Sequence, residues 1–333
     1  MARSRFLPDN FTLAMIVVVI VATVLPCYGQ GAVVFDAVTN AAICLLFFLH
    51  GAKLPREAII AGMTHWRLHL LVLLCTFVLF PVLGFALKPL LMPLVTPDLY
   101  LGILFLCMLP STVQSSIAFT AVARGNVPAA ICSASASNLI GIFLTPLLVG
   151  LVTTAHISGG GSVDAIIRIA LQLLLPFVAG QIARRWIGGW VERNKGWLKN
   201  VDQSSILLVV YTAFSAAVGQ GLWQRTAPSS LAGLLVIDVV LLGLVMGSTA
   251  LLSRKLGFSR EDRIAIVFCG SKKSMASGVP MAKVLFASGT IGAVVLPLML
   301  FHQLQLMVCA VLAQHYATQS EALAVAKAHT PAT

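Results

Sequence analysis

The sequence predicts an all-α, polytopic membrane protein with ten transmembrane helices in a five-plus-five inverted repeat. Three observations lead to this prediction. Of the 333 residues, 59% are hydrophobic and only 10% are charged, whereas soluble domains have roughly 25% charged residues. Apolar runs of about 20 residues, the length that crosses a bilayer, recur along the chain. Finally, the basic residues alternate between successive loops, as the positive-inside rule requires.

Each apolar run is justified as a span by its length and by the charge of the loops beside it. With the N-terminus in the cytoplasm, most of the 22 lysines and arginines fall in cytoplasmic segments. Both termini are then cytoplasmic, and the protein is expected in the inner (plasma) membrane. The expected spans are 11–29, 32–50, 68–87, 98–123, 127–152, 163–187, 201–219, 230–253, 262–286 and 289–315.

An odd number of spans in each half gives the second half the opposite orientation, as in the inverted repeats of many secondary transporters. We expect one integral membrane domain over 1–333, with repeats at 1–155 and 160–318 and a cytoplasmic tail at 319–333. The net charge of +11 is attributed to cytoplasmic loops, and nucleic acid is not expected as a partner. The seven cysteines lack metal-ligand spacing and are expected to be small buried hydrophobes.

Two spans carry an interruption at corresponding places in the two halves. Pro110 removes a backbone donor from span 98–123, and Gly270 precedes a polar cluster in span 262–286. Paired interruptions of this kind indicate a transport site, although a simple proline kink is the alternative for the first. The polar residues that follow are Ser111, Thr112, Gln114, Ser115 and Ser116 in one span, and Ser271, Lys272, Lys273 and Ser274 in the other.

Lys272 and Lys273 lie nine or ten residues beyond Arg263, which puts them about 14 Å deep in the membrane. A lysine at this depth costs roughly 2.5–3.5 kcal/mol on insertion scales. Neighbouring helical residues also point about 100° apart, so one lipid-facing surface does not hold both. We expect at least one of the two amines to face a watery cavity or an anionic solute; snorkelling, or a re-entrant loop, is the alternative.

Further polar residues lie within the apolar segments. Ser133 and Ser137 share a face of span 127–152 with Asn138 nearby, and they could either complete a sodium shell or pack closely against another helix. Asp238 is a candidate proton carrier or partner for a buried lysine. The remaining polar residues of this kind are Asp36, Asn40, His302, Gln303 and Gln305.

These residues resemble the bile acid:sodium symporter superfamily, and most closely its branch of bacterial symporter-like proteins. The matching stretches are Leu46 to Leu54, Leu109 to Ser116, Ser133 to Pro146, Phe268 to Met281 and Phe301 to Gln303. The resemblance implies a panel domain of spans 1, 2, 6 and 7, and a core domain in which broken spans 4 and 9 cross. It places sodium ligands on Ser115, Ser116, Ser133, Ser137 and Ser271.

The sequence departs from the family where a carboxylate would serve both sodium sites, because Ser271 to Lys273 stand there. A fixed ammonium could supply the positive charge of a sodium ion, or could lose a proton. We therefore expect a sodium- or proton-coupled symporter of a small organic anion that works by alternating access, as a monomer or homodimer in contact with lipid. No enzyme activity and no cofactor beyond Na⁺ as a coupling ion are expected; the alternative is a non-transporting regulator of ion homeostasis. The expected solute ligands are Ser111, Thr112, Gln114, Asn138, Lys272, Lys273 and Ser274.

Overall fold

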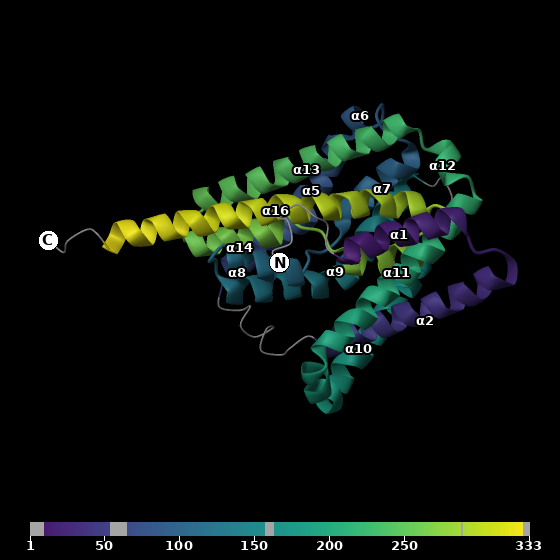
Figure 1. The fold of residues 1–333 in the computed structure, drawn as a ribbon, viewed down its shortest axis with the longest axis horizontal. Helices are drawn as coiled ribbons and strands as arrows, with labels where there is room; N and C mark the ends of the chain where they lie inside the picture. The colour runs from purple at the N-terminus through teal and green to yellow at the C-terminus, as the bar shows by residue number, and fades with distance from the viewer. Residues whose placement is uncertain (1–9, 54–64, 157–162, 288, 329–333) are drawn as a thin grey trace.

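The computed structural model describes residues 10–53, 65–156, 163–287 and 289–328, and the regular secondary structure of this part of the chain is all helical, without a strand (Figure 1). The first half contains α1 (Asn10–Val24), α2 (Gly29–Lys53), α4 (Trp66–Leu74), the π-helix η1 (Cys75–Leu79), α5 (Phe80–Ala86), α6 (Lys88–Leu91), α7 (Pro97–Met108), α8 (Gln114–Val122) and α9 (Val127–His156). The second half contains α10 (Val163–Arg193), α11 (Lys195–Gly219), α12 (Leu222–Arg225), α13 (Pro228–Lys255), α14 (Arg260–Gly270), α15 (Met275–Leu285) and α16 (Ile291–Ala328).

Within the described residues, six helical segments are long and apolar enough to cross a membrane, and Leu13–Val24 and Pro97–Met108 are shorter apolar helices. The outward faces of the helices carry large apolar side chains, such as Val24 and Val33, each 70% exposed. Because water would not tolerate so many of these, the molecule is a polytopic helical membrane protein. The six segments are Gly29–Lys53, Trp66–Ala86, Val127–Val152, Lys195–Gly219, Pro228–Lys255 and Ile291–Gln319.

The helices pack into two groups. In the first group, α1 packs on α11, and α2 packs on both α10 and α11. In the second group, α7 packs on α16, α4 and α14 pack on α9, and α13 packs on α14 and α16. Figure 1 shows α2 and α10 running side by side and projecting away from the second group. The groups meet where α11 contacts α15 and α16, and where α10 contacts α9.

Two glycines allow the close approach of α2 and α10. A Cβ atom at Gly51 would lie 2.0 Å from the Phe177 carbonyl oxygen, and one at Gly180 would lie 1.9 Å from the Phe48 carbonyl oxygen. No side chain fits at either distance, so each backbone packs directly on the other, as small residues permit between membrane helices.

Several expected boundaries differ from those of the structure. The run expected at 68–87 is a helix from 66 to 86 whose middle turn, Cys75–Leu79, is π-helical. The last helix continues to Ala328, well past residue 315. The joint between the expected repeats 1–155 and 160–318, the first nine residues and the last five residues of the tail fall largely or wholly outside the described residues.

Candidate functional site at the helix interruptions

Both expected interruptions are present in the structure. Helix α7 ends at Met108 and α8 begins at Gln114, while α14 ends at Gly270 and α15 begins at Met275. Leu109 has an extended backbone (φ −75°, ψ 153°), the conformation that a following proline favours. On the other side, the Ser274 hydroxyl caps α15 by accepting a hydrogen bond from the Ser277 amide (3.2 Å).

The two interruptions contact each other directly, although they come from opposite halves of the chain. The Ser274 amide donates to the Pro110 carbonyl (2.8 Å), and the Ser111 hydroxyl donates to the Cys269 carbonyl (2.5 Å). We call residues 109–113 and 271–274 together the junction. Because backbone groups at helix breaks have lost their intrahelical partners, each interruption supplies partners to the other.

Helix α9 joins both sides of the junction. The side-chain nitrogen of Asn138 donates to the Ser111 carbonyl (2.6 Å), and its side-chain oxygen accepts from the Ser277 hydroxyl (2.8 Å). The preceding residue contributes as well: the Ser137 hydroxyl accepts from the backbone amide of Ser111 (3.0 Å). A Cβ atom at Gly141 would lie only 2.7 Å from Pro110 Cβ, so the absence of a side chain there lets the break rest against α9.

Lys273 is completely buried, and its ammonium donates to three backbone carbonyls. The acceptors are Thr76 (2.8 Å), Cys107 (2.8 Å) and Leu109 (2.7 Å). The Phe80 ring covers the ammonium with its centroid 4.0 Å away. We call these three oxygens and this ring the carbonyl cage. All three donors of the ammonium are thereby used.

Lys272 is equally buried but differently placed. Its Nζ has no hydrogen-bond partner among the described residues. Instead, the ring centroids of Phe119 and Phe268 lie 4.2 Å and 5.3 Å from it. The neighbouring lysines thus have different environments: the Lys273 ammonium is fully hydrogen-bonded, while the Lys272 ammonium lies against two aromatic faces.

Each of the expected sodium ligands is hydrogen-bonded to another protein group. The Ser115 hydroxyl pairs with that of Thr112 (2.8 Å), and Ser137 accepts from Ser111 as described above. The remaining three serines are hydrogen-bonded as follows. The Ser116 hydroxyl donates to the Phe268 carbonyl (3.0 Å), the Ser133 hydroxyl pairs with His69 Nδ1 (2.7 Å), and the Ser271 hydroxyl donates to the Val267 carbonyl (2.6 Å). Among the described residues, no carboxylate is hydrogen-bonded to these serines. In the structure these hydroxyls are hydrogen-bonded to other protein groups, and sodium binding by them stays a prediction.

The expected solute ligands lie around the junction with different exposures. Gln114 is exposed, Asn138 is half-buried, and Thr112 is 8% exposed. Ser111, Lys272, Lys273 and Ser274 are buried. Gln114 of α8 and Asn138 of α9 are therefore the least buried of the expected solute ligands.

Three residues that form hydrogen bonds at or near the candidate site were not singled out from the sequence. His69 bonds to Ser133, Thr145 donates to the Met108 carbonyl (2.8 Å), and Ser277 bonds to Asn138. A histidine inside an apolar run was a usable signal for the first. Thr145 carried none, because a threonine in a membrane helix commonly bonds to its own preceding turn.

Asp238 does not pair with a buried lysine. Its side chain is fully buried in α13, and neither carboxylate oxygen has a hydrogen-bond partner among the described residues. The candidate partners at the junction are occupied otherwise: Lys273 by carbonyls and Lys272 by aromatic rings. Gln305 instead holds the backbone of Lys273, accepting from its amide (2.9 Å) and donating to its carbonyl (3.0 Å).

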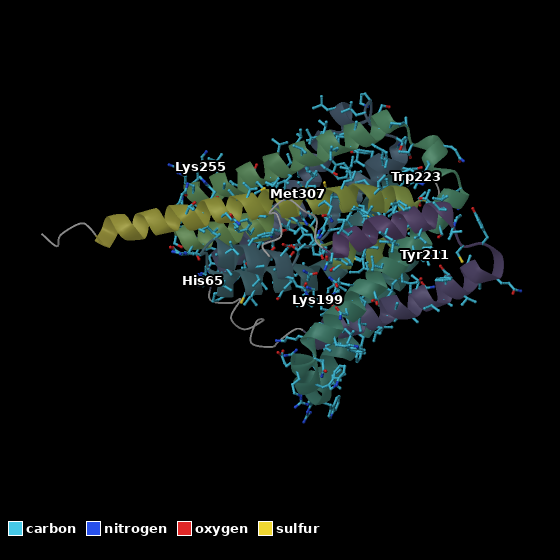
Figure 2. All side chains as sticks on the ribbon, in the orientation of Figure 1. His65, Lys199, Tyr211, Trp223, Lys255 and Met307 are labelled. Atoms are coloured by element: carbon cyan, nitrogen blue, oxygen red, sulfur yellow. The ribbon has the colours of Figure 1, made fainter. Side chains whose placement is uncertain are left out.

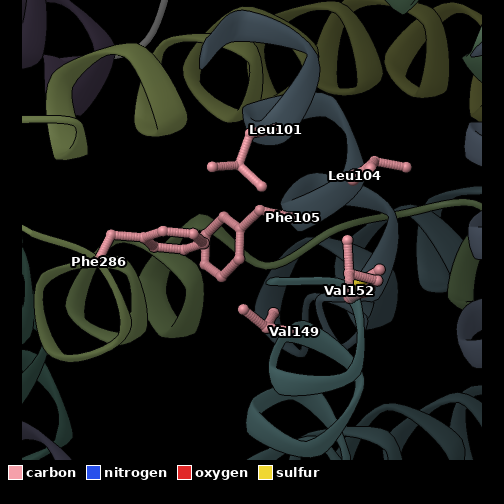
Figure 3. Close-up of a pocket in the computed structure, with 7 residues that line it drawn as sticks. Leu101, Leu104, Phe105, Val149, Val152 and Phe286 are labelled. Atoms are coloured by element: carbon pink, nitrogen blue, oxygen red, sulfur yellow. The ribbon is translucent and has the colours of Figure 1, made fainter. Parts of the chain in front are cut away.

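A small hollow beside α7 is apolar throughout. Phe105 and Phe286 pack edge-to-face in its wall, with ring centroids 5.2 Å apart (Figure 3). Val149 of α9 and Leu104 of α7 also line it. With no polar group to orient a solute, this hollow is not the candidate site, and the junction is.

Among helical membrane proteins, two interrupted helices in contact at a polar junction are typical of transporters. The model of the SBF-like CPA transporter family matches residues 9–318, and the chain belongs to that family.

Relatives of known sequence agree with this assignment. The chain is 68% identical over 331 residues, 99% of both chains, to an uncharacterised protein of Pseudomonas aeruginosa. It is 57% identical over 318 residues, 95% of both chains, to YfeH of Escherichia coli, whose name describes it as a candidate symporter. It is also 29% identical over 278 residues to sodium/bile acid cotransporter 7 of Mus musculus, covering 83% of this chain and 82% of that one. Family and relatives point to a transporter rather than an enzyme.

Proposed function

We propose that the protein is a secondary transporter that moves a small organic anion by alternating access, coupled to sodium or to protons. The observation that carries this proposal is the junction itself: two helix breaks from opposite halves meet through the hydrogen bond from Ser274 to Pro110. Irregular backbone at membrane depth is tolerated only where protein or a water-filled cavity surrounds it. Paired breaks of this kind are typical of solute sites in transporters.

The proposed architecture has ten spans in a five-plus-five inverted repeat. Ten segments follow if α4 to α5, α7 with α8, and α14 with α15 each count as one span. The helix contacts support this repeat, because helices that would correspond in the two halves make corresponding contacts. The contact of α7 with α16 corresponds to that of α14 with α9, and the contact of α1 with α11 corresponds to that of α10 with α2. The first helix group is the proposed panel domain and the second is the proposed core domain, which would move against each other around the junction.

An anionic solute is favoured by the charges at the junction. Two buried amines, Lys272 and Lys273, lie there, and the N-termini of α8 and α15 add the positive ends of their helix dipoles. In the proposed site, Gln114, Thr112 and Asn138 contact the solute from the accessible side, and Ser111 and Ser274 shape the backbone behind them. The lysines act chiefly through their positive potential.

The proposed orientation puts both termini in the cytoplasm of a cell whose inner membrane holds the protein. Figure 2 places Lys255 and His65 at the end from which the last turns of α16 extend, and Trp223 at the opposite end. A basic cytoplasmic end agrees with the positive-inside rule. A monomer or homodimer embedded in lipid is the proposed state.

The experiment is uptake into proteoliposomes that contain the purified protein. Radiolabelled taurocholate and a series of small dicarboxylates serve as probes, under an imposed sodium gradient, an imposed pH gradient, or neither. We expect accumulation of at least one anion under one of the gradients, and its loss in Asn138→Ala. The matched control is Asn194→Ala, because the Asn194 side chain donates to the Trp190 carbonyl four residues earlier, between α10 and α11 and outside the junction. Absence of gradient-driven flux for every probe, with both variants behaving like the parent, would contradict the proposal.

A further inference from the structure

We infer that the Lys273 ammonium is a built-in cation: it fills a cation-binding site made of backbone carbonyls, so that no free cation is needed or admitted there. The inference rests on the proposed function only in that it concerns the same junction. Its test requires no transported solute.

The oxygens of the carbonyl cage form a real cation site. Cys107 and Leu109 supply carbonyls from the end of α7, where the last helical carbonyls lack partners and the helix dipole is negative. Thr76 supplies its carbonyl from the π-helix η1, a local irregularity typical of functional positions. The distances of 2.7–2.8 Å are those of charge-assisted hydrogen bonds. The face of the Phe80 ring closes the site with the electron-rich surface that cations prefer.

Contacts at the junction position the Lys273 side chain so that its ammonium reaches the carbonyl cage. Gln305 of α16 bonds to both the amide and the carbonyl of Lys273, which fixes the backbone from which the side chain extends. The side chain then reaches three carbonyls in two different segments of the first half. Lys273 thus ties the break of the second half to the break and the π-helix of the first.

Removing the amine would leave three inward-facing carbonyls without a donor. Buried acceptors without partners are costly, and three convergent carbonyl oxygens are what a bare monovalent cation or a small ammonium ion binds. A shortened side chain would also leave space for such an ion. The parent, whose cage is filled, should bind none there.

The test is thermal unfolding of the purified protein in detergent, at constant ionic strength, in sodium chloride, ethylammonium chloride or choline chloride. The parent is expected to unfold at the same temperature in ethylammonium chloride and in choline chloride, and its behaviour in sodium chloride is the baseline for the variants. Lys273→Ala is expected to unfold roughly 5–10 °C lower in choline chloride, and to recover part of this loss, saturably, in ethylammonium or sodium. Choline should not rescue it, because the quaternary group is too large and has no N–H donor.

Lys272→Ala is the matched control, since it removes an adjacent and equally buried amine that has no carbonyl partner within the part of the chain that the structure describes. It should show no salt-specific recovery. Where Lys273→Ala does not fold, Lys273→Gln replaces it: the amide donates to part of the cage, and a smaller recovery in ethylammonium is expected. Equal recovery in the Lys272 and Lys273 variants, or recovery in neither, would overturn the inference. If the unfolding experiment shows no salt-specific recovery, the proposal of anion transport still stands. If the uptake experiment shows no transport, the inference about Lys273 still stands.

Discussion

Lys283 of α15 forms an ion pair with Asp36 of α2, and this pair joins the two helix groups. The Lys283 side chain is 8% exposed, whereas that of Asp36 is 48% exposed. Asn40, one turn further along α2, also donates to Asp36 (3.1 Å). If the groups move against each other, this contact is one that must change.

Exchange of the two charges tests the pair. Lys283→Asp and Asp36→Lys each place like charges together and should lower the unfolding temperature. The double exchange should restore most of the loss, with a coupling of about 1 kcal/mol, because Asp36 is half-exposed. A double-mutant cycle from thermal unfolding in detergent measures this. Asn40→Ala, which keeps both charges, is the control, and strictly additive effects of the two exchanges would show that the pair contributes nothing.

Replacement of Lys272 by methionine should separate stability from transport. The amine has no hydrogen-bond partner among the described residues, so an apolar side chain of similar volume removes a desolvation cost and packs on Phe119 and Phe268. We expect Lys272→Met to unfold at the same or a higher temperature than the parent, and to lose anion uptake at least tenfold. Lys273→Met should instead unfold at a lower temperature. Lower stability in the Lys272 variant would indicate that its ammonium has a favourable partner.

Loss of the Asn138 side chain should weaken the junction. Asn138→Ala leaves the Ser111 carbonyl without this donor and the Ser277 hydroxyl without its acceptor. The expected destabilisation is about 1–3 kcal/mol, read as a lower unfolding temperature, together with loss of uptake. Ser277→Ala should remove only part of this, since the bond to Ser111 remains. An Asn138→Ala protein with parental stability and uptake would argue against this network.

Substitution of Gly180 should force α2 and α10 apart. An added methyl group would lie 1.9 Å from the Phe48 carbonyl oxygen, so Gly180→Ala is expected to lower the unfolding temperature markedly. Gly189→Ala in the same helix is the control, because nothing lies within 4 Å of its Cβ position. There the substitution should be neutral or slightly stabilising, since alanine favours helix over glycine by about 1 kcal/mol. Equal effects at the two positions would contradict the close packing.

The interruptions were predictable from the sequence because their causes are local. Pro110 lacks a backbone donor, and Gly270 stands before four polar residues in an apolar segment. The groups that surround each of the two lysine ammonium groups were not predictable in the same way. Lys272 and Lys273 are identical side chains at neighbouring positions, and the groups that distinguish them belong to η1, α7, α8 and α14.

Composition, apolar run length and the positions of proline, glycine and lysine by themselves determined a helical membrane protein with two polar breaks. These features act through local backbone chemistry and transfer to lipid, which depend on residue type alone. Only the tertiary structure decided that the breaks of opposite halves touch, that α2 and α10 meet at Gly51 and Gly180, and that Lys273 bonds to the carbonyls of Thr76, Cys107 and Leu109. Every residue has a carbonyl, so no sequence pattern marks the three that converge; packing of distant segments selects them.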